Sequence, residues 1–172
     1  MNIKDTIRSI PDFPKPGILF YDITTLLLNP HAFSQAVDSM VEHFKDKGIE
    51  AVAGIESRGF IFGAPLALRL NCPFILIRKP GKLPAETVSA EYSLEYGADS
   101  IHMHKDAVAP GRKVLLVDDL LATGGTMDAA CRLVTSLDAT VAGIAFAIEL
   151  DFLKGREKLK DFDIFTLVHY DD

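Results

Sequence analysis

Two adjacent acids and a short polar segment are the residues best suited to do chemistry in this sequence. Asp118 and Asp119 are followed almost at once by small and hydroxyl-bearing residues, namely Ala122, Thr123, Gly124, Gly125 and Thr126. The glycines let the backbone turn tightly and approach a ligand closely. Threonine hydroxyls and the free N–H groups at a helix start can together surround an anion. The segment 122–126, called the phosphate loop below, is therefore predicted to bind a phosphate group.

The acids restrict the kind of phosphate compound. Asp118 and Asp119 would repel a bare phosphate unless they also bind something else. Ribose hydroxyls, which donate hydrogen bonds, or a hydrated Mg²⁺ would resolve this conflict. An isolated Asp-Asp pair forms a turn or a helix cap about as often as it has another role. The attached loop favours a binding role here. Neither a Gly-x-Gly-x-x-Gly fingerprint nor a Walker loop occurs in the sequence.

The flanking residues predict the elements that hold this unit. Val114–Val117 are four apolar residues, typical of a strand buried on both faces. After the loop, one apolar helix face is formed by Met127, Ala130, Cys131, Val134 and Leu137. Cys131 is thus expected in the core. The acids should lie where the strand ends and the loop where the helix begins.

Positive charge is concentrated after two other predicted strands. Arg58 follows the buried run 51–55, and a basic turn containing Arg78, Lys79 and Lys82 follows the run 73–77. Open α/β sheets bind ligands at the carboxyl ends of their strands. These cations are candidates for an anionic substrate group, and ordinary solvated surface charges are the alternative.

The remaining pattern alternates strands and helices. Helices are predicted over 3–9, from Pro30 with Asn29 as its cap, over 60–70 and, shorter, near 152–159. Further strands are predicted over 139–148 and 164–168, and a two-stranded flap over 86–104 with its turn at 96–99. Prolines interrupt residues 11–16, so segment 12–25 is expected to be a partly extended covering loop. The class is α/β, with a mostly parallel sheet and helices on both faces, in one domain over 1–172.

Composition gives no support for several kinds of partner. The 172 residues carry a net charge of −6, which does not favour nucleic acid or an anionic membrane. The longest apolar run, near 142–148, is much shorter than the roughly 18 residues of a membrane span, and no signal peptide is evident. A cytoplasmic protein is expected. Cys72 and Cys131 have no metal-ligand spacing.

Four separate motifs, which fall in the order of a known family, carry a resemblance to it. Residues 114–126 resemble the phosphoribosyl pyrophosphate signature of type I phosphoribosyltransferases. Their sequence is similar to that of the family members that act on adenine. Glu56–Gly63 resembles the family's pyrophosphate loop, and Ser93–Gly97 its flap motif. The resemblance covers nearly the whole chain. It implies the type I fold with an N-terminal hood (about 12–25), a mobile flap loop (about 79–107), Mg²⁺ as cofactor and a homodimer.

The resemblance also implies a reaction and roles. Adenine and phosphoribosyl pyrophosphate would give AMP and pyrophosphate, through an oxocarbenium-like state. Arg58, Arg78, Lys79 and Lys82 would bind the pyrophosphate, Asp118 and Asp119 the ribose, and the phosphate loop the 5′-phosphate, with Tyr96 also on the donor. Glu95 would be the acid/base near the purine. Metal would be held mainly through substrate and water.

The hood would bind the base. Leu19 would offer its backbone N–H and C=O to the adenine edge, and Tyr21 would border the base. The chain departs from the family pattern at Tyr21, where most relatives carry arginine, and at Glu91-Tyr92, where many have Ser/Thr-Tyr. Two alternatives are a phosphoribosyltransferase for another purine and a purine-sensing regulator of the same fold.

Overall fold

A computed structural model describes residues 1–172, which divide into two compact units, Met1–Ser39 and Met40–Asp172. The first unit contains η1 (Ile3–Thr6), β1 (Arg8–Pro11), β2 (Leu19–Asp22) and α1 (Thr24–Leu27). Helix α2 (Pro30–Phe44) begins there and ends in the second unit. Its predicted cap is confirmed, because the Asn29 side chain accepts a hydrogen bond from the Ala32 N–H at 3.1 Å.

The helix predicted over 3–9 is wrong. Only the turn η1 forms, capped by Asn2, and the chain then becomes the extended strand β1. Thr25 explains the change of direction, since its hydroxyl accepts a hydrogen bond from the Arg8 N–H at 3.1 Å. Segment 12–25 is partly extended, as predicted, because its residues Leu19–Asp22 form β2, which pairs antiparallel with β1 in a hairpin. Within it the Arg8 guanidinium lowers the pKa of Asp22 to about 2.

A five-stranded sheet forms the centre of the second unit, in the order β4-β3-β7-β8-β9. The strands are β3 (Ala51–Ile55), β4 (Phe74–Ile77), β7 (Lys113–Leu121), β8 (Thr140–Leu150) and β9 (Ile164–Tyr170). Every neighbouring pair is parallel. The mostly parallel sheet is confirmed, and its carboxyl ends all lie at one edge.

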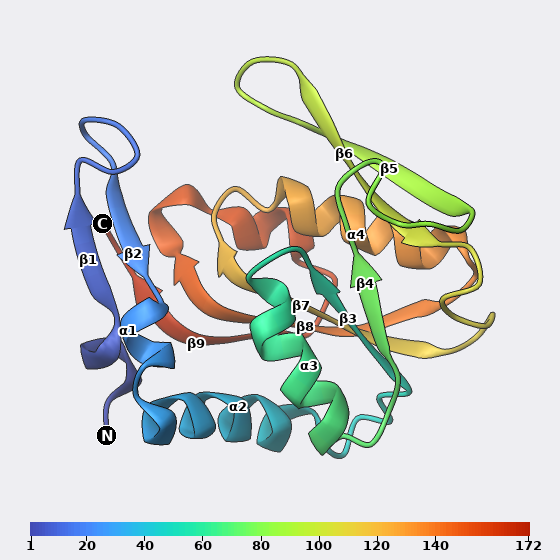
Figure 1. The fold of residues 1–172 in the computed structure, drawn as a ribbon, viewed down its shortest axis with the longest axis horizontal. Coiled ribbons are helices and arrows are strands. Elements are labelled where there is room, and N and C mark those ends of the chain that lie inside the picture. The colour runs from blue at the N-terminus through green and yellow to red at the C-terminus, as the bar shows by residue number, and fades with distance from the viewer. The chain divides into compact units, whose positions relative to one another are not determined.

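Helices cover both faces of this sheet, as predicted (Figure 1). Helix α4 (Gly125–Ser136) shares a buried cluster with alternate strand residues such as Ala53 and Leu116. Helix α3 (Gly59–Arg69) packs on the opposite face, where a side-chain carbon on Gly59 would lie 2.8 Å from the Val117 carbonyl oxygen. Cys131 lies in the α4 cluster, as expected, and burial raises the pKa of its thiol to about 12.

The flap is an antiparallel hairpin of β5 (Thr87–Ser93) and β6 (Ala98–His104), coloured green to yellow in Figure 1. Its turn lies at 94–97 rather than at 96–99, because Ser93 pairs with Ala98 and Tyr92 with Asp99. The predicted alternation is confirmed, since Ala90 and Ile101 are buried while Ser89 is exposed.

Two other boundaries differ from prediction. The short helix expected near 152–159 is a pair of 3₁₀ turns, η2 (Asp151–Leu153) and η3 (Gly155–Leu159), separated by Lys154 in the left-handed region. Strand β7 continues to Leu121, because its pairing with β8 extends to Leu121 opposite Glu149. Asp118 and Asp119 therefore lie within the last residues of the strand rather than after it. No helix combines the length and hydropathy needed to cross a bilayer.

Candidate active site

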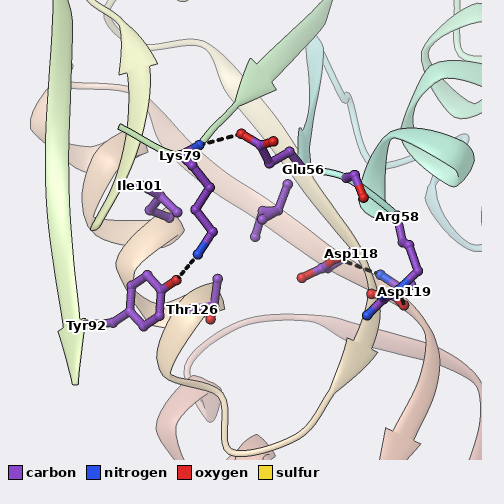
Figure 2. Close-up of a pocket in the computed structure, with 10 residues that line it drawn as sticks. Glu56, Arg58, Lys79, Tyr92, Ile101, Asp118, Asp119 and Thr126 are labelled. Carbon is purple, nitrogen blue, oxygen red and sulfur yellow. Dashed lines mark hydrogen bonds and ion pairs between the residues drawn. The ribbon is translucent and has the colours of Figure 1, made fainter. Parts of the chain in front are cut away.

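A cavity of about 410 Å³ opens at the carboxyl ends of β3, β4 and β7. Figure 2 shows Arg58 beside the two acids on β7, and Lys79 with Tyr92 on the other side of the cavity. The lining residues are Ile55, Glu56, Ser57, Arg58, Lys79, Tyr92, Ile101, Asp118, Asp119 and Thr126. As predicted, the fold brings the acids, Arg58 and Lys79 together at one edge of the sheet.

The two acids have different partners. Nε of Arg58 donates to Oδ2 of Asp119 at 2.5 Å, and the Asp119 side chain is only 11% exposed. Asp118 accepts a hydrogen bond from the Asp119 N–H at 2.8 Å. Burial raises the pKa of Asp118 well above its ordinary value, and the charge of Asp119 raises it further. One guanidinium thus faces two carboxyl groups, which leaves this side of the cavity acidic.

Glu56 joins the loops that follow β3 and β4. Its Oε1 accepts a hydrogen bond from the Lys79 N–H at 2.5 Å and lies 3.4 Å from Nε of Arg78. The Arg78 Nε is buried without an aligned hydrogen-bond acceptor. The backbone of Arg78 pairs with His102 of β6 in both directions, at 2.9 and 2.7 Å. The basic turn is therefore attached to both the sheet and the flap.

Lys79 also reaches the flap through its side chain. Its Nζ donates to the Tyr92 hydroxyl at 2.5 Å and to Oδ2 of Asp99 at 2.7 Å (Figure 2 shows the first of these). Burial opposes the charge of Lys79, but the hydrogen bonds with Asp99 and Tyr92 prevail and raise its pKa. Lys79 is thus a full cation at the cavity wall, suitable for a phosphate oxygen.

A second, smaller cavity of about 80 Å³ lies over the phosphate loop. Gly124 has φ of +86°, and a side-chain carbon there would lie 2.6 Å from the carbonyl oxygen of Gly155. At Gly125, the first residue of α4, the same carbon would meet nothing within 4 Å. The two glycines therefore differ: Gly124 allows the turn, and Gly125 leaves open the space where a ligand can approach the helix start.

Several predicted residues lie outside the main cavity. Arg78 is half-buried behind Glu56, and Lys82 is exposed in the loop between β4 and β5. Glu95 and Tyr96 lie in the exposed turn of the flap, where Tyr96 is 88% exposed. Leu19 and Tyr21 lie on β2 in the first unit, with Leu19 46% exposed and Tyr21 half-buried.

Sequence reasoning missed Glu56, Asp99 and Gly155. Glu56 directly follows a buried strand, the same signal that singled out Asp118, and could have been found in that way. Asp99 was missed because the turn of the flap was predicted at 96–99, and a turn residue has no expected partner across the hairpin. In the structure Asp99 lies on β6, opposite Tyr92. Gly155 gave no local signal, since its neighbour in space, Ala122, is distant in sequence.

Comparison with known proteins identifies the family. Residues 24–170 match the phosphoribosyl transferase domain family. Adenine phosphoribosyltransferase from Acidobacterium capsulatum is 57% identical over 170 residues, which cover 99% of this chain and 94% of that protein. The crystal structure of adenine phosphoribosyltransferase from Thermoanaerobacter pseudethanolicus is similar with a TM-score of 0.94 and 52% identity, covering 98% of both chains.

A third relative carries bound ligands. Adenine phosphoribosyltransferase from Saccharomyces cerevisiae, solved with an imino-altritol bisphosphate and adenine, has a TM-score of 0.91 and 43% identity, covering 96% of both chains. The likeness extends over the flap, the phosphate loop and the sheet edge, since nearly all of the chain is matched. The chain belongs to the adenine phosphoribosyltransferase family.

Proposed function

We propose that this protein transfers the 5-phosphoribosyl group of phosphoribosyl pyrophosphate to adenine, giving AMP and pyrophosphate. The bond from the anomeric carbon to the pyrophosphate oxygen breaks, and a bond from a ring nitrogen of adenine to that carbon forms. The proton on that nitrogen leaves. Adenine is also the base bound in the Saccharomyces relative.

The set of charged groups around the main cavity carries this proposal. Lys79 lies on the flap side with Tyr92, and Arg58 lies across the cavity beside Asp118 and Asp119, next to the phosphate-loop cavity. A donor with pyrophosphate, ribose hydroxyls and a 5′-phosphate presents three groups that match these surroundings in turn. Cations neutralise the leaving group, carboxylates accept from hydroxyls, and backbone N–H groups surround the phosphate.

Mg²⁺ fits the acidic side of the cavity. Two carboxyl groups share one guanidinium there, so the acidic side has an oxygen-rich surface of the kind that Mg²⁺ prefers. Asp118 and Asp119 would face a hydrated ion that is held mainly by the donor's oxygens. When bound, the ion would neutralise the charge that develops on pyrophosphate.

The protein's own part in the reaction is positioning and electrostatics. Arg58 and Lys79 are held in place before the donor arrives, by Asp119 and by Tyr92 with Asp99. Cationic hydrogen-bond donors that are fixed in this way stabilise charge that appears only in the transition state. Glu95 in the flap would take the proton from adenine, and closure of the flap would exclude water that otherwise hydrolyses the donor.

The hood would read the base through backbone groups. Leu19 lies opposite Pro11 in the hairpin, and proline has no N–H to give to the Leu19 carbonyl. The Leu19 N–H and C=O would pair with the adenine edge and Tyr21 would border the ring. The working assembly would be a homodimer, which sedimentation equilibrium tests directly.

Pyrophosphate release measured with a panel of purines tests the proposed function. Release should require phosphoribosyl pyrophosphate, Mg²⁺ and adenine together, and guanine, hypoxanthine and xanthine should be poor acceptors. Preference for a 6-oxopurine would indicate the alternative phosphoribosyltransferase. Binding of donor and purine with no pyrophosphate released would indicate the sensing regulator.

A further inference from the structure

Turn η3 lies directly against the phosphate loop. The Gly155 carbonyl oxygen lies 2.6 Å from where a side-chain carbon on Gly124 would be, and a side-chain carbon on Gly155 would collide with the Ala122 carbonyl oxygen. Gly155 and Gly124 thus meet backbone to backbone, with no side chain between them. A shift of η3 must therefore move the loop or open a gap beneath it.

The next residue, Arg156, fixes η3 to the sheet. Its Nε donates to Oε1 of Glu149 at 2.9 Å and its Nη2 to Oε2 of the same carboxylate at 2.6 Å. A third contact runs from Nη1 to the Ile164 carbonyl at 3.5 Å. Two parallel hydrogen bonds fix the orientation of the guanidinium as well as its distance. Arg156 therefore ties η3 to both β8 and β9.

Glu149 lies at the level of the loop within the sheet. It pairs with Leu121, the last residue of β7, immediately before Ala122. Its side chain is 6% exposed, so its charge depends on a partner in the protein. The path from Arg156 to the phosphate loop thus has two short arms, one through Glu149 to the end of β7 and one through Gly155 to Gly124.

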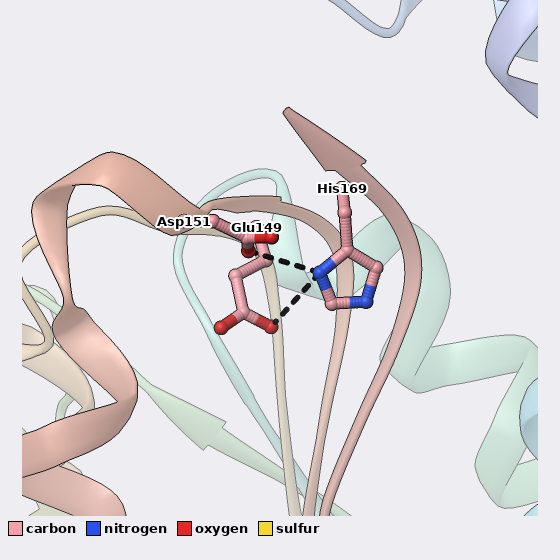
Figure 3. A group of neighbouring side chains, drawn as sticks. All are labelled: Glu149, Asp151 and His169. Atoms are coloured by element: carbon pink, nitrogen blue, oxygen red, sulfur yellow. Dashed lines mark hydrogen bonds and ion pairs between the residues drawn. The ribbon is translucent and has the colours of Figure 1, made fainter. Parts of the chain in front are cut away.

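Asp151 and His169 surround the same carboxylate, as Figure 3 shows. Nδ1 of His169 lies 2.9 Å from Asp151 and 3.7 Å from Glu149. These three side chains have the types and spacing of a metal site. However, both oxygens of Glu149 already accept hydrogen bonds from Arg156. The guanidinium supplies the positive charge here, so the group is better explained as support for Arg156.

We infer that Arg156 is a positioning residue for the 5′-phosphate, acting through Glu149 and Gly155 on the phosphate loop. The inference rests on the proposed function, because it takes the loop to bind the donor's phosphate. Arg156 does not line either cavity at the site. Its effect should therefore be specific to the phosphate end of the donor, since a small misplacement of a binding loop is costly.

The test compares Arg156→Gln and Arg156→Lys with the wild-type enzyme. Calorimetry with ribose 5-phosphate should show about tenfold weaker binding in Arg156→Gln, a change of about 1.4 kcal/mol. Arg156→Lys keeps the charge but loses the planar pair of hydrogen bonds, so its affinity should fall between the two. In turnover, KM for phosphoribosyl pyrophosphate should rise similarly, while KM for adenine stays within about twofold of the wild-type value.

Arg112→Gln is the matched control. Arg112 also forms an ion pair with a glutamate, Glu50, through one hydrogen bond of 2.9 Å, but it precedes the opposite end of β7 and its side chain is 57% exposed. This variant should keep the wild-type affinity for ribose 5-phosphate.

Three outcomes would overturn the inference. Unchanged affinity for ribose 5-phosphate in whichever Arg156 variant folds would show that Arg156 serves stability alone. An equal loss for donor and adenine would show general damage to the enzyme. Wild-type protein that does not bind ribose 5-phosphate would overturn this inference and the phosphate site of the proposed function together. Wild-type protein that binds it but does not use adenine would reject only the proposed function, and the calorimetric comparison would still decide the role of Arg156.

Discussion

Nε of Arg58 lies 2.5 Å from Oδ2 of Asp119, so the residue expected to bind pyrophosphate and one expected to bind ribose are paired with each other. The Arg58 side chain is 51% exposed while that of Asp119 is 11% exposed. Asp119 therefore holds the base of a guanidinium whose exposed part lines the cavity. The ion pair positions Arg58 for the pyrophosphate before the donor binds.

Arg58→Gln should lower kcat/KM for phosphoribosyl pyrophosphate by roughly 10²–10³-fold, the effect of removing one positioned donor from a developing anion. Steady-state kinetics with varied donor provide the measurement. Arg69→Gln is the control, because Arg69 is an exposed residue at the other end of α3. Equal activity in both variants would reject the role of Arg58.

The two glycines of the phosphate loop should respond differently to substitution. Gly125→Val adds a side chain where the structure has open space, so it should remain folded but bind the donor at least about tenfold more weakly, or ~1.4 kcal/mol. Gly124→Ala places a carbon against Gly155 at a positive φ, so it should lower the melting temperature. Calorimetry and thermal melts separate the two effects. Unchanged donor binding in Gly125→Val would contradict the phosphate pocket.

The sheet and the cavity at its edge could be predicted because their signals are local. Val114–Val117 and Ala51–Ile55 are uninterrupted apolar runs, and the polar residues that follow them necessarily share one edge of a parallel sheet. The extension of β7 through Asp118 could not be predicted in this way. It depends on pairing with β8, which the residues of β7 do not encode by themselves. Arg156 was missed for a related reason, since its partner Glu149 and the loop that its neighbour Gly155 contacts are brought near it only by the fold.

Asp118 should make stability depend on pH. Burial and the neighbouring charge of Asp119 raise its pKa above the ordinary 3.8, although Arg58 opposes this slightly. A raised acid pKa means that the folded state holds its proton more tightly, so stability is lost as pH rises from about 3.8 through the folded-state pKa. Asp118→Asn should therefore melt higher than wild type at pH 7 to 8, by roughly 2–4 °C for each kcal/mol recovered.

The difference in melting temperature should disappear near pH 4, where the wild-type carboxyl is protonated as well. Asp106→Asn, at an exposed position, should show no such trend. Activity should fall in Asp118→Asn despite the gain in stability. A melting difference that does not change with pH would contradict the raised pKa assigned to the Asp118 carboxyl.

Glu95→Gln tests the flap. A positioned acid/base typically contributes about 10²–10⁴-fold, so the chemical step in single-turnover experiments should slow by that factor while adenine binding changes little. Glu91→Gln is a suitable control, because Glu91 is an exposed glutamate of the same hairpin. If Glu95→Gln loses only affinity for adenine, Glu95 is a binding residue and another group accepts the proton.

Tyr21 tests how the base is chosen. A backbone N–H and C=O at Leu19 would match the acceptor and amino donor of adenine, but they would leave a 6-oxopurine with an unpaired polar edge, which is costly. The identity of residue 21 should then affect affinity more than selectivity. Tyr21 is half-buried on β2 opposite Ser9, consistent with an apolar wall that also has a hydroxyl. We expect Tyr21→Arg to stay selective for adenine. Tyr21→Ala should lose affinity for adenine without gaining activity on guanine or hypoxanthine. Turnover on all three bases measures this, and Tyr21→Ala accepting hypoxanthine as readily as adenine would show that the side chain, not the backbone, sets specificity.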